Sequence, residues 1–182
     1  MKLLFIYPKD RMNLGLTLAT AAYEKIWLKD GERIQQVLAR YTGLHFQQKE
    51  IRVEVHDGVS LSGTLDTPMR LNLRNDTLHL KCFALIHELG HRLLSGNGIG
   101  SKEEDDDEFV EEEHMRLYLF EGEVIQALYG NGVYAEWSRL RKENDTTAYE
   151  WASRLTVAER QTYLRRMVDT NELSSHTQPA SL

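Results

Sequence analysis

Apolar side chains recur at helical spacing through the first forty residues of the chain. Residues 13–28 are rich in Ala and Leu, and residues 34–41 place further apolar side chains three and four positions apart. Side chains spaced in this way lie on one face of an α-helix. Thr42-Gly43 then indicates a helix end, because glycine readily adopts the left-handed conformation that closes many helices. We therefore expect N-terminal helices.

The period changes between residues 51 and 73, where apolar and polar residues alternate. Alternation places the apolar side chains on one face of a β-strand. The runs cover residues 51–55, 59–65 and 69–73, and Asp57-Gly58 lies between the first two. An Asp-Gly pair between alternating runs is typical of a β-hairpin. The pattern predicts a small sheet of about three strands that begins with a hairpin.

Helical spacing returns after residue 74. Asn75-Asp76-Thr77 is a helix-cap signal, and the helix that follows is expected to span residues 78–94 before a glycine-rich exit. A second helix is predicted over residues 109–129, where Gly130-Asn131-Gly132 closes it.

The last third of the chain is also predicted to be helical. Asp145-Thr146 is expected to begin one helix, and Thr156 with Glu159 forms the capping box of another. The end of the chain consists mainly of Ser, Thr, Gln and Pro, so we interpret residues 171–182 as a disordered tail. Residues 1–170 are then expected to form one domain of the α+β class.

The composition excludes several classes of partner. The chain has 182 residues and a net charge of -6, and no stripe of Lys and Arg is apparent, which argues against a nucleic-acid partner. No stretch reaches the roughly 20 apolar residues that a membrane span needs. The apolar run at residues 3–7 is too short for a signal peptide. We therefore expect a cytoplasmic protein without membrane partners, and the sequence does not indicate its oligomeric state.

The predicted helix over residues 78–94 carries His87-Glu88-Leu89-Gly90-His91, which has the form His-Glu-x-x-His. Residues four apart lie on one helix face, so both imidazoles can reach one metal ion. Glu88 is placed to take a proton from a zinc-bound water as that water attacks a polarised carbonyl. The alternative is a helix with two core histidines and a surface glutamate. Gly90 costs about 1 kcal/mol relative to Ala in a helix, which favours the close approach of another backbone or a ligand there.

Catalytic zinc usually takes three protein ligands, so a third ligand is expected from the helix over residues 109–129. Three polar residues, Glu113, His114 and Glu121, fall within the apolar face of that helix, which is defined by Val110, Leu117, Phe120, Val124 and Leu128. A charge on an apolar face is costly unless it is paired. We favour Glu113 over His114 as the third ligand, and we expect Glu121 to orient a ligand from behind.

Two further features bear on the predicted site: an acidic run and a donor for the oxyanion. The acidic run at residues 103–108 is interpreted as a solvated loop before a helix. A donor for the transition-state oxyanion is also needed, and the sequence does not choose among its candidates: Tyr118, Tyr129, Tyr134 and His56.

The segments HELGHRLL and EEEHMRLYL resemble the compact, gluzincin-like zincins, and in particular the ImmA/IrrE-type metallopeptidases of prokaryotes and phages. The resemblance covers about residues 45–130. It implies a zincin-like fold, a Zn²⁺ cofactor, His87 and His91 as ligands, Glu88 as general base and Glu113 as third ligand. It also implies that a sheet edge, here within residues 59–73, holds an extended substrate. The family has a small residue after its glutamate, where this chain has His114.

These observations predict a zinc-dependent metallopeptidase that hydrolyses peptide bonds in a protein or peptide substrate. The alternative is a catalytically weak, metal-binding zincin module with a regulatory or protein-interaction role. The two differ in the importance of Glu88, because only a peptidase needs its carboxylate for turnover.

Overall fold

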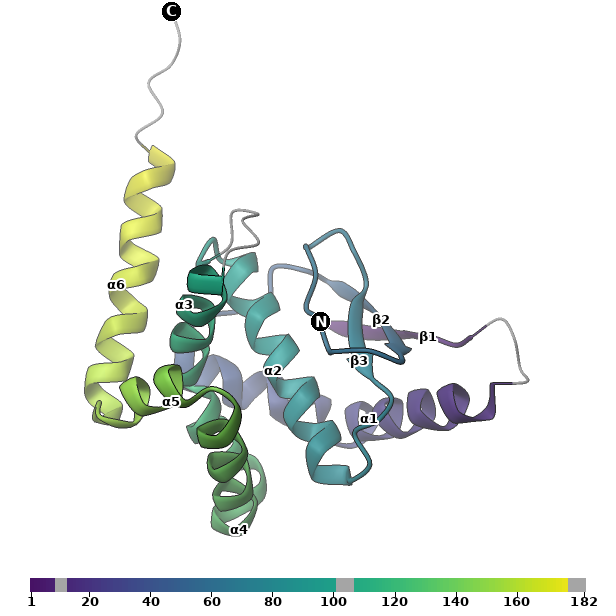
Figure 1. The fold of residues 1–182 in the computed structure, drawn as a ribbon. Helices are drawn as coiled ribbons and strands as arrows, with labels where there is room; N and C mark the ends of the chain where they lie inside the picture. Colours follow the sequence, from purple (N-terminus) through teal and green to yellow (C-terminus); the bar gives the residue numbers. More distant parts are fainter. Residues whose placement is uncertain (9–12, 101–106, 177–182) are drawn as a thin grey trace, which may run out of the picture.

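A computed structural model describes residues 1–8, 13–100 and 107–176, without the side chains of residues 107–110 and 168–176. The fold is α+β, as expected, with a small sheet and long helices (Figure 1). The elements in chain order are β1 (Lys2–Ile6), α1 (Leu14–Thr42), β2 (Glu50–His56), β3 (Met69–Asn72), α2 (Leu78–Gly96), α3 (Asp107–Tyr118), α4 (Glu121–Asn144), α5 (Thr146–Ser153) and α6 (Val157–His176).

The N-terminal helices that we expected form one continuous helix, α1. Asn13 caps its start by accepting a hydrogen bond from the main-chain N–H of Leu16. Gly43 ends it in the left-handed conformation, with φ at 74°, as the Thr42-Gly43 pair predicted. Tyr23, Ile34 and Leu38 are fully buried along the inner face of this helix, which covers the sheet and α2.

The sheet has three strands in the order β1-β2-β3, and both strand pairs are parallel. The predicted hairpin is therefore wrong. The segment after Asp57 forms a connection between two parallel strands, and its Leu61 makes only an isolated antiparallel bridge to Arg70. Val59 and Leu61 remain 75% and 50% exposed, so the apolar side chains of this segment are not buried as those of a core strand would be. The third strand is instead β1, at the N-terminus.

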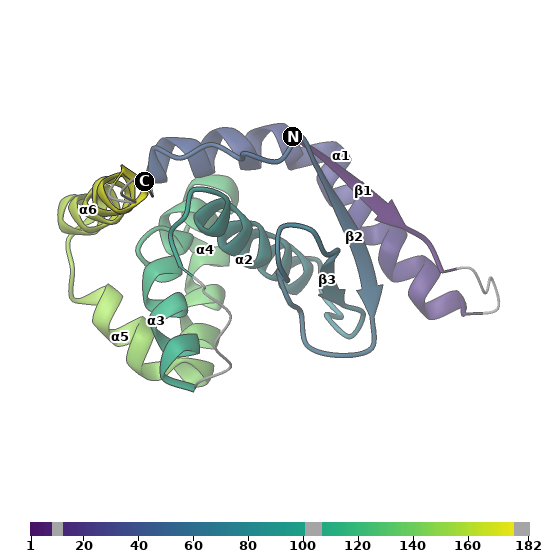
Figure 2. The same ribbon diagram turned by 90° about the horizontal axis from the view of Figure 1, so that it is seen from above.

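Helix α2 lies at the centre of the molecule, between the sheet and the helices that follow it (Figures 1 and 2). It contacts α1, β3, α3 and α4. Thr77 caps its start by accepting a hydrogen bond from the N–H of Leu80. Leu85, Ile86 and Leu89 are fully buried. This burial fixes the rotation of the helix and hence the direction in which its polar residues point.

The helix predicted over residues 109–129 is broken into α3 and α4 at Leu119 and Phe120. Gly130 interrupts the helix as expected, because its backbone is not helical (φ 83°, ψ 179°). A further helical stretch follows directly and runs to Asn144, so α4 consists of two helical parts joined by a kink at Gly130. The apolar face was predicted well where its side chains are described, because Leu117, Phe120, Val124 and Leu128 are all buried. The side chain of Val110 lies outside the described residues.

Helices α5 and α6 pack at the far side of α3 and α1 (Figure 2). The capping box at the start of α6 is confirmed, because Thr156 and Glu159 exchange side-chain to main-chain hydrogen bonds. Residues 171–176, predicted to be part of a disordered tail, continue α6, and residues 177–182 lie outside the described residues. Among the described helices, none has the length and apolar character needed to cross a bilayer.

Candidate metal centre

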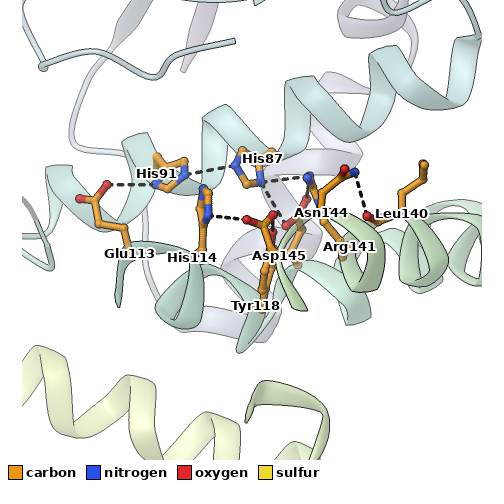
Figure 3. A network of polar contacts seen from close by, with 10 residues as sticks. His87, His91, Glu113, His114, Tyr118, Leu140, Arg141, Asn144 and Asp145 are labelled. Carbon is orange, nitrogen blue, oxygen red and sulfur yellow. Dashed lines mark hydrogen bonds and ion pairs between the residues drawn. The ribbon is translucent and has the colours of Figure 1, made fainter. Parts of the chain in front are cut away.

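Three imidazoles converge between α2 and α3. His87 and His91 project from one face of α2, and His114 projects toward them from α3 (Figure 3). One nitrogen from each of the three rings can be chosen so that all three atoms lie within 4.8 Å of one another. The centroid of the His114 ring is 5.2 Å from that of the His87 ring and 5.6 Å from that of the His91 ring. These three residues could therefore hold a metal ion.

The close approach of α3 to α2 depends on Gly90. A Cβ at this position would lie 2.3 Å from Cδ1 of Leu117 on α3 and 3.4 Å from the ring of Phe120. The sequence suggested that a backbone or a ligand comes close to this glycine. The nearest neighbours are instead buried side chains that bring α3, and with it His114, against the histidine-bearing face of α2.

The spacing of the two α2 histidines fits a tetrahedral metal site. Their Nε2 atoms are 3.3 Å apart. Two ligand nitrogens at the usual zinc–nitrogen distance of about 2.0–2.1 Å are roughly 3.3–3.4 Å apart in tetrahedral geometry. An all-imidazole donor set suits zinc, copper, iron or nickel better than it suits magnesium or calcium.

Each histidine has a carboxylate beside its Nδ1 atom. Glu121 Oε2 lies 3.2 Å from Nδ1 of His87, and Asp145 Oδ1 lies 3.1 Å from Nδ1 of His114. Glu113 Oε2 lies 3.8 Å from Nδ1 of His91, so this third contact is an ion-pair distance rather than a hydrogen bond. A carboxylate that accepts the Nδ1 proton leaves Nε2 unprotonated and available to a metal.

The structure thus separates the two residues that the sequence offered as third ligand. His114 belongs to the cluster with His87 and His91. Glu113, which we favoured from the sequence, lies on the opposite side of the His91 ring from the His87–His91 contact. Glu121 lies behind His87, in the position expected of a residue that orients a ligand.

Glu121 is fully buried and has two partners. Its second carboxylate oxygen accepts a hydrogen bond of 3.0 Å from Nη2 of Arg141. Burial alone would raise the pKa of Glu121, but the charge of Arg141, together with the contact to His87, lowers it to about 2. Glu121 therefore stays ionised. Nδ1 of His87 lies 3.2 Å from Oε2 of Glu121 and 3.1 Å from Nη2 of Arg141, so it donates to the carboxylate in one tautomer of the ring and accepts from the guanidinium in the other.

Asp145 connects His114 to Tyr118. Its Oδ2 atom accepts a hydrogen bond from the Tyr118 hydroxyl, while its Oδ1 atom faces His114. Burial would raise the pKa of Asp145, but hydrogen bonds from these two partners outweigh it and lower the pKa to about 2. The Tyr118 ring stacks on the His114 ring, with centroids 5.8 Å apart and planes 23° apart.

Burial keeps the two α2 histidines neutral. It lowers the pKa of His87, with the charge of Arg141 acting in the same direction, and it lowers the pKa of His91 well below its ordinary value. A neutral imidazole is the form that ligates a metal. Burial also raises the pKa of Glu88 to about 8, because only 4% of this residue is exposed. A nearby dication would counter that rise, since it favours the carboxylate.

A cavity of about 250 Å³ adjoins the cluster at His114. It is lined by Glu111 of α3 and by polar residues from the end of α4 and the start of α5, namely Asn144, Asp145, Thr146 and Thr147. Of the three histidines only His114 lines this cavity, together with Asp145, its partner at Nδ1.

The other sequence-predicted candidates differ in their relation to the cluster. Among the four proposed oxyanion donors, Tyr118 lies beside it. His56 is 2.8 Å from the carbonyl oxygen of Val59, and Tyr134 stacks on Trp137. Tyr129 lines a separate cavity with Cys82.

Two other expectations concern the surroundings of the site. Within residues 59–73, Leu61 and Arg70 exchange main-chain hydrogen bonds of 2.9 and 2.8 Å, so that part of the edge is already paired. The acidic run at residues 103–108 falls outside the part of the chain that the structure describes, apart from the helical backbone of its last two residues.

Sequence reasoning missed Arg141 and Asp145. Neither residue falls in a motif, and they lie 54 and 31 positions from the histidines that they contact. Asp145 carried one signal, since it was predicted to begin a helix, but that signal points to capping rather than to a metal centre.

Comparisons of the chain with protein-family models, with curated proteins and with solved structures return no match. A function for the chain has to be inferred from its own residues.

Proposed function

We propose that the protein is a zinc-dependent peptidase whose metal ligands are His87, His91 and His114. The observation that carries the proposal is the convergence of these three imidazoles, with Glu88 next to the first of them in the same helix. Three protein ligands with one open position are typical of catalytic zinc. The His-Glu-x-x-His spacing is the motif in which a glutamate serves as general base in metallopeptidases.

The chain's own residues have separate tasks in this proposal. The three imidazoles hold the ion, and Glu121, Asp145 and Glu113 hold the imidazoles from behind. When bound, zinc acidifies a coordinated water and polarises a substrate carbonyl. Glu88 takes the proton of the attacking water and passes it to the leaving amine, as a general base and then a general acid.

Two properties of Glu88 support this role. The residue is largely buried, which raises the pKa of its carboxyl group to about 8 in the absence of metal, and a bound dication would favour the carboxylate that a general base needs. A general base also has to face the reacting water rather than coordinate the metal. Glu88 fits the second part of this requirement, since it lies outside the group of three residues that could hold the ion.

The proposal of zinc rests on the donor set. Imidazoles bind several first-row metals, but zinc has no redox chemistry of its own and is the usual ion of His-Glu-x-x-His sites. A peptide as substrate is supported by the motif and by the resemblance to zincin peptidases.

The test compares wild type with Glu88→Gln. Glu143→Gln serves as the matched control, because Glu143 pairs with Arg139 on an exposed turn of α4. Each protein is purified without chelators. Zinc per chain is measured by elemental analysis, and cleavage of a mixed peptide library is followed by mass spectrometry.

We expect about one zinc per chain in all three proteins and a loss of cleavage of about 10²–10⁴-fold in Glu88→Gln alone. Zinc in every protein with no cleavage by wild type would favour the metal-binding module instead. Equal cleavage by wild type and Glu88→Gln would overturn the proposed mechanism, and absence of zinc from wild type would overturn the metal site.

A further inference from the structure

Asp145 occupies the junction between α4 and α5, and its side chain is fully engaged with α3. Oδ1 lies 3.1 Å from Nδ1 of His114, and Oδ2 accepts a hydrogen bond from Tyr118. His114 and Tyr118 are one helical turn apart on α3, so a single carboxylate contacts two successive turns of that helix (Figure 3).

The position of Asp145 in the chain would suit a different role. It is the N-cap residue of α5, and aspartate is among the residues preferred there because its side chain can accept a hydrogen bond from the first turn. Asp145 makes no such side-chain bond. Only its main-chain carbonyl takes part in the helix start, by accepting a hydrogen bond from the N–H of Tyr149. The carboxylate therefore contacts His114 and Tyr118 instead of capping α5.

Two constraints together fix the orientation of the His114 ring. The hydrogen bond to Asp145 sets the rotation of the ring about its own axis, since Nδ1 has to face the carboxylate. The stacked Tyr118 ring sets the tilt of the ring plane. With Nδ1 turned to Asp145, the other nitrogen, Nε2, points toward His87 and His91 (Figure 3).

We propose that Asp145 is a positioning residue that presents Nε2 of His114 to the metal ion, with Tyr118 holding the carboxylate in place. This inference rests on the metal site of the proposed function but is independent of peptidase activity. His87 and His91 belong to one helix and share its rigidity. His114 comes from another helix, so its place in the site depends on contacts such as this one.

The design of the test separates positioning from capping. In Asp145→Ser the hydroxyl can still cap α5, but it is too short to reach His114. Asp145→Asn keeps an acceptor oxygen of the same size without the charge. Tyr118→Phe keeps the stacked ring and loses the hydroxyl. Asp57→Ser is the matched control, because Asp57 pairs with Arg74 on the surface.

Zinc affinity is measured for each full-length protein by competition with a chromophoric chelator, and thermal unfolding of the metal-free proteins is recorded. Co²⁺ is used as a spectroscopic probe, since its visible bands report the geometry of its ligands. We expect Asp145→Ser to bind zinc about 10- to 100-fold more weakly than wild type, with an altered Co²⁺ spectrum and a near-unchanged unfolding midpoint without metal. Asp145→Asn and Tyr118→Phe should show smaller losses, and Asp57→Ser none.

Zinc affinity and a Co²⁺ spectrum in Asp145→Ser that match wild type would overturn the inference, while leaving the proposed peptidase untouched. In the reverse case, wild type binds zinc but cleaves no peptide, and Asp145→Ser binds zinc more weakly than wild type. That result would remove the proposed peptidase activity and support the role of Asp145. If Asp145→Ser lost affinity only in proportion to a lower unfolding midpoint without metal, Asp145 would be a fold residue and the inference would fail.

Discussion

The carboxylate of Glu121 lies 3.2 Å from Nδ1 of His87, although the two residues are 34 positions apart in the chain. Glu121 is the first residue of α4, directly after the break that separates this helix from α3. The break therefore places a carboxylate behind a histidine of α2. Because Arg141, from a later turn of α4, donates to the other oxygen of Glu121, the pair also joins α4 to itself across the bend at Gly130.

Removal of Glu121 should be costly to the fold. Glu121→Ala would leave the guanidinium of Arg141, which is 17% exposed, without its carboxylate partner. Breaking a buried pair in this way typically costs about 3–5 kcal/mol. We expect a loss in that range in the free energy of unfolding, measured with urea on the metal-free protein. Glu121→Gln, which preserves the shape and one acceptor, should lose less.

The control for this measurement is Glu143→Ala on the same helix, whose exposed pair with Arg139 should contribute less than about 1 kcal/mol. A similar small loss in Glu121→Ala would mean that the buried pair does not stabilise the fold.

The identity of the third ligand can be decided by metal content. His114→Ala should lose stoichiometric zinc, because two imidazoles alone seldom hold a catalytic zinc. Glu113→Ala should keep about one zinc per chain with a modest loss of affinity, since Glu113 lies 3.8 Å from the far nitrogen of His91. Elemental analysis of the two variants beside wild type gives the answer. The reverse pattern, with zinc lost from Glu113→Ala and kept by His114→Ala, would restore the ligand that the sequence favoured.

Local patterns predicted the elements whose signals are contained within one segment. The start of α2 at Thr77, the left-handed end of α1 at Gly43 and the capping box at Thr156 are each set by residues within four positions of one another. The parallel sheet is different, because β1 pairs with a strand almost fifty residues away. The Asp57-Gly58 pair favours a hairpin locally, but β2 instead pairs in parallel with β1 and β3, and no local signal predicts this pairing.

The residues of the site also divide into those that a local pattern predicts and those that only the packing of distant segments brings together. His87, Glu88 and His91 could be found from the sequence, since the repeat of the helix alone brings the two imidazoles to one face. The place of His114 depends on the packing of Leu117 and Phe120 against Gly90, which is a contact between two helices. The place of Glu121 depends on the break at Leu119 and Phe120, and neither of these residues carries a helix-breaking signal. Asp145 and Arg141 reach the cluster only through the packing of α4 and α5. A single sequence contains no local pattern for such contacts.

The stability of the metal-free protein should respond to pH through Glu88. Its pKa is near 4.5 when unfolded and about 8 in the fold, so the folded state holds a proton that the unfolded chain releases between these values. Its contribution to stability is therefore full below pH 4.5 and is lost as pH rises toward 8. Glu88→Gln, which carries no charge, should differ least from wild type at pH 5, by about 1 kcal/mol. At pH 8 it should be more stable, by a few kcal/mol at most.

This prediction is checked by thermal unfolding of chelator-treated wild type and Glu88→Gln at pH 5, 6.5 and 8. His87 and His91, whose pKa values are lowered, destabilise both proteins as pH falls below 6.5, so their effect cancels in the difference. A difference that stays constant over this range would show that Glu88 ionises normally in the fold.

Gly90→Ala tests whether packing between α2 and α3 holds the three histidines together. Ala favours a helix by about 1 kcal/mol over Gly, but its Cβ would lie 2.3 Å from the buried side chain of Leu117. Overpacking of this kind costs about 1–3 kcal/mol, and the displacement of α3 should also carry His114 away from His87 and His91. We expect a lower unfolding midpoint together with weaker zinc binding. Gly96→Ala, at the end of the same helix, is the matched control, because its Cβ would meet only Gln47 at 3.8 Å. Weaker zinc binding by both variants would mean that the substitution acts through the helix itself rather than through the position of α3.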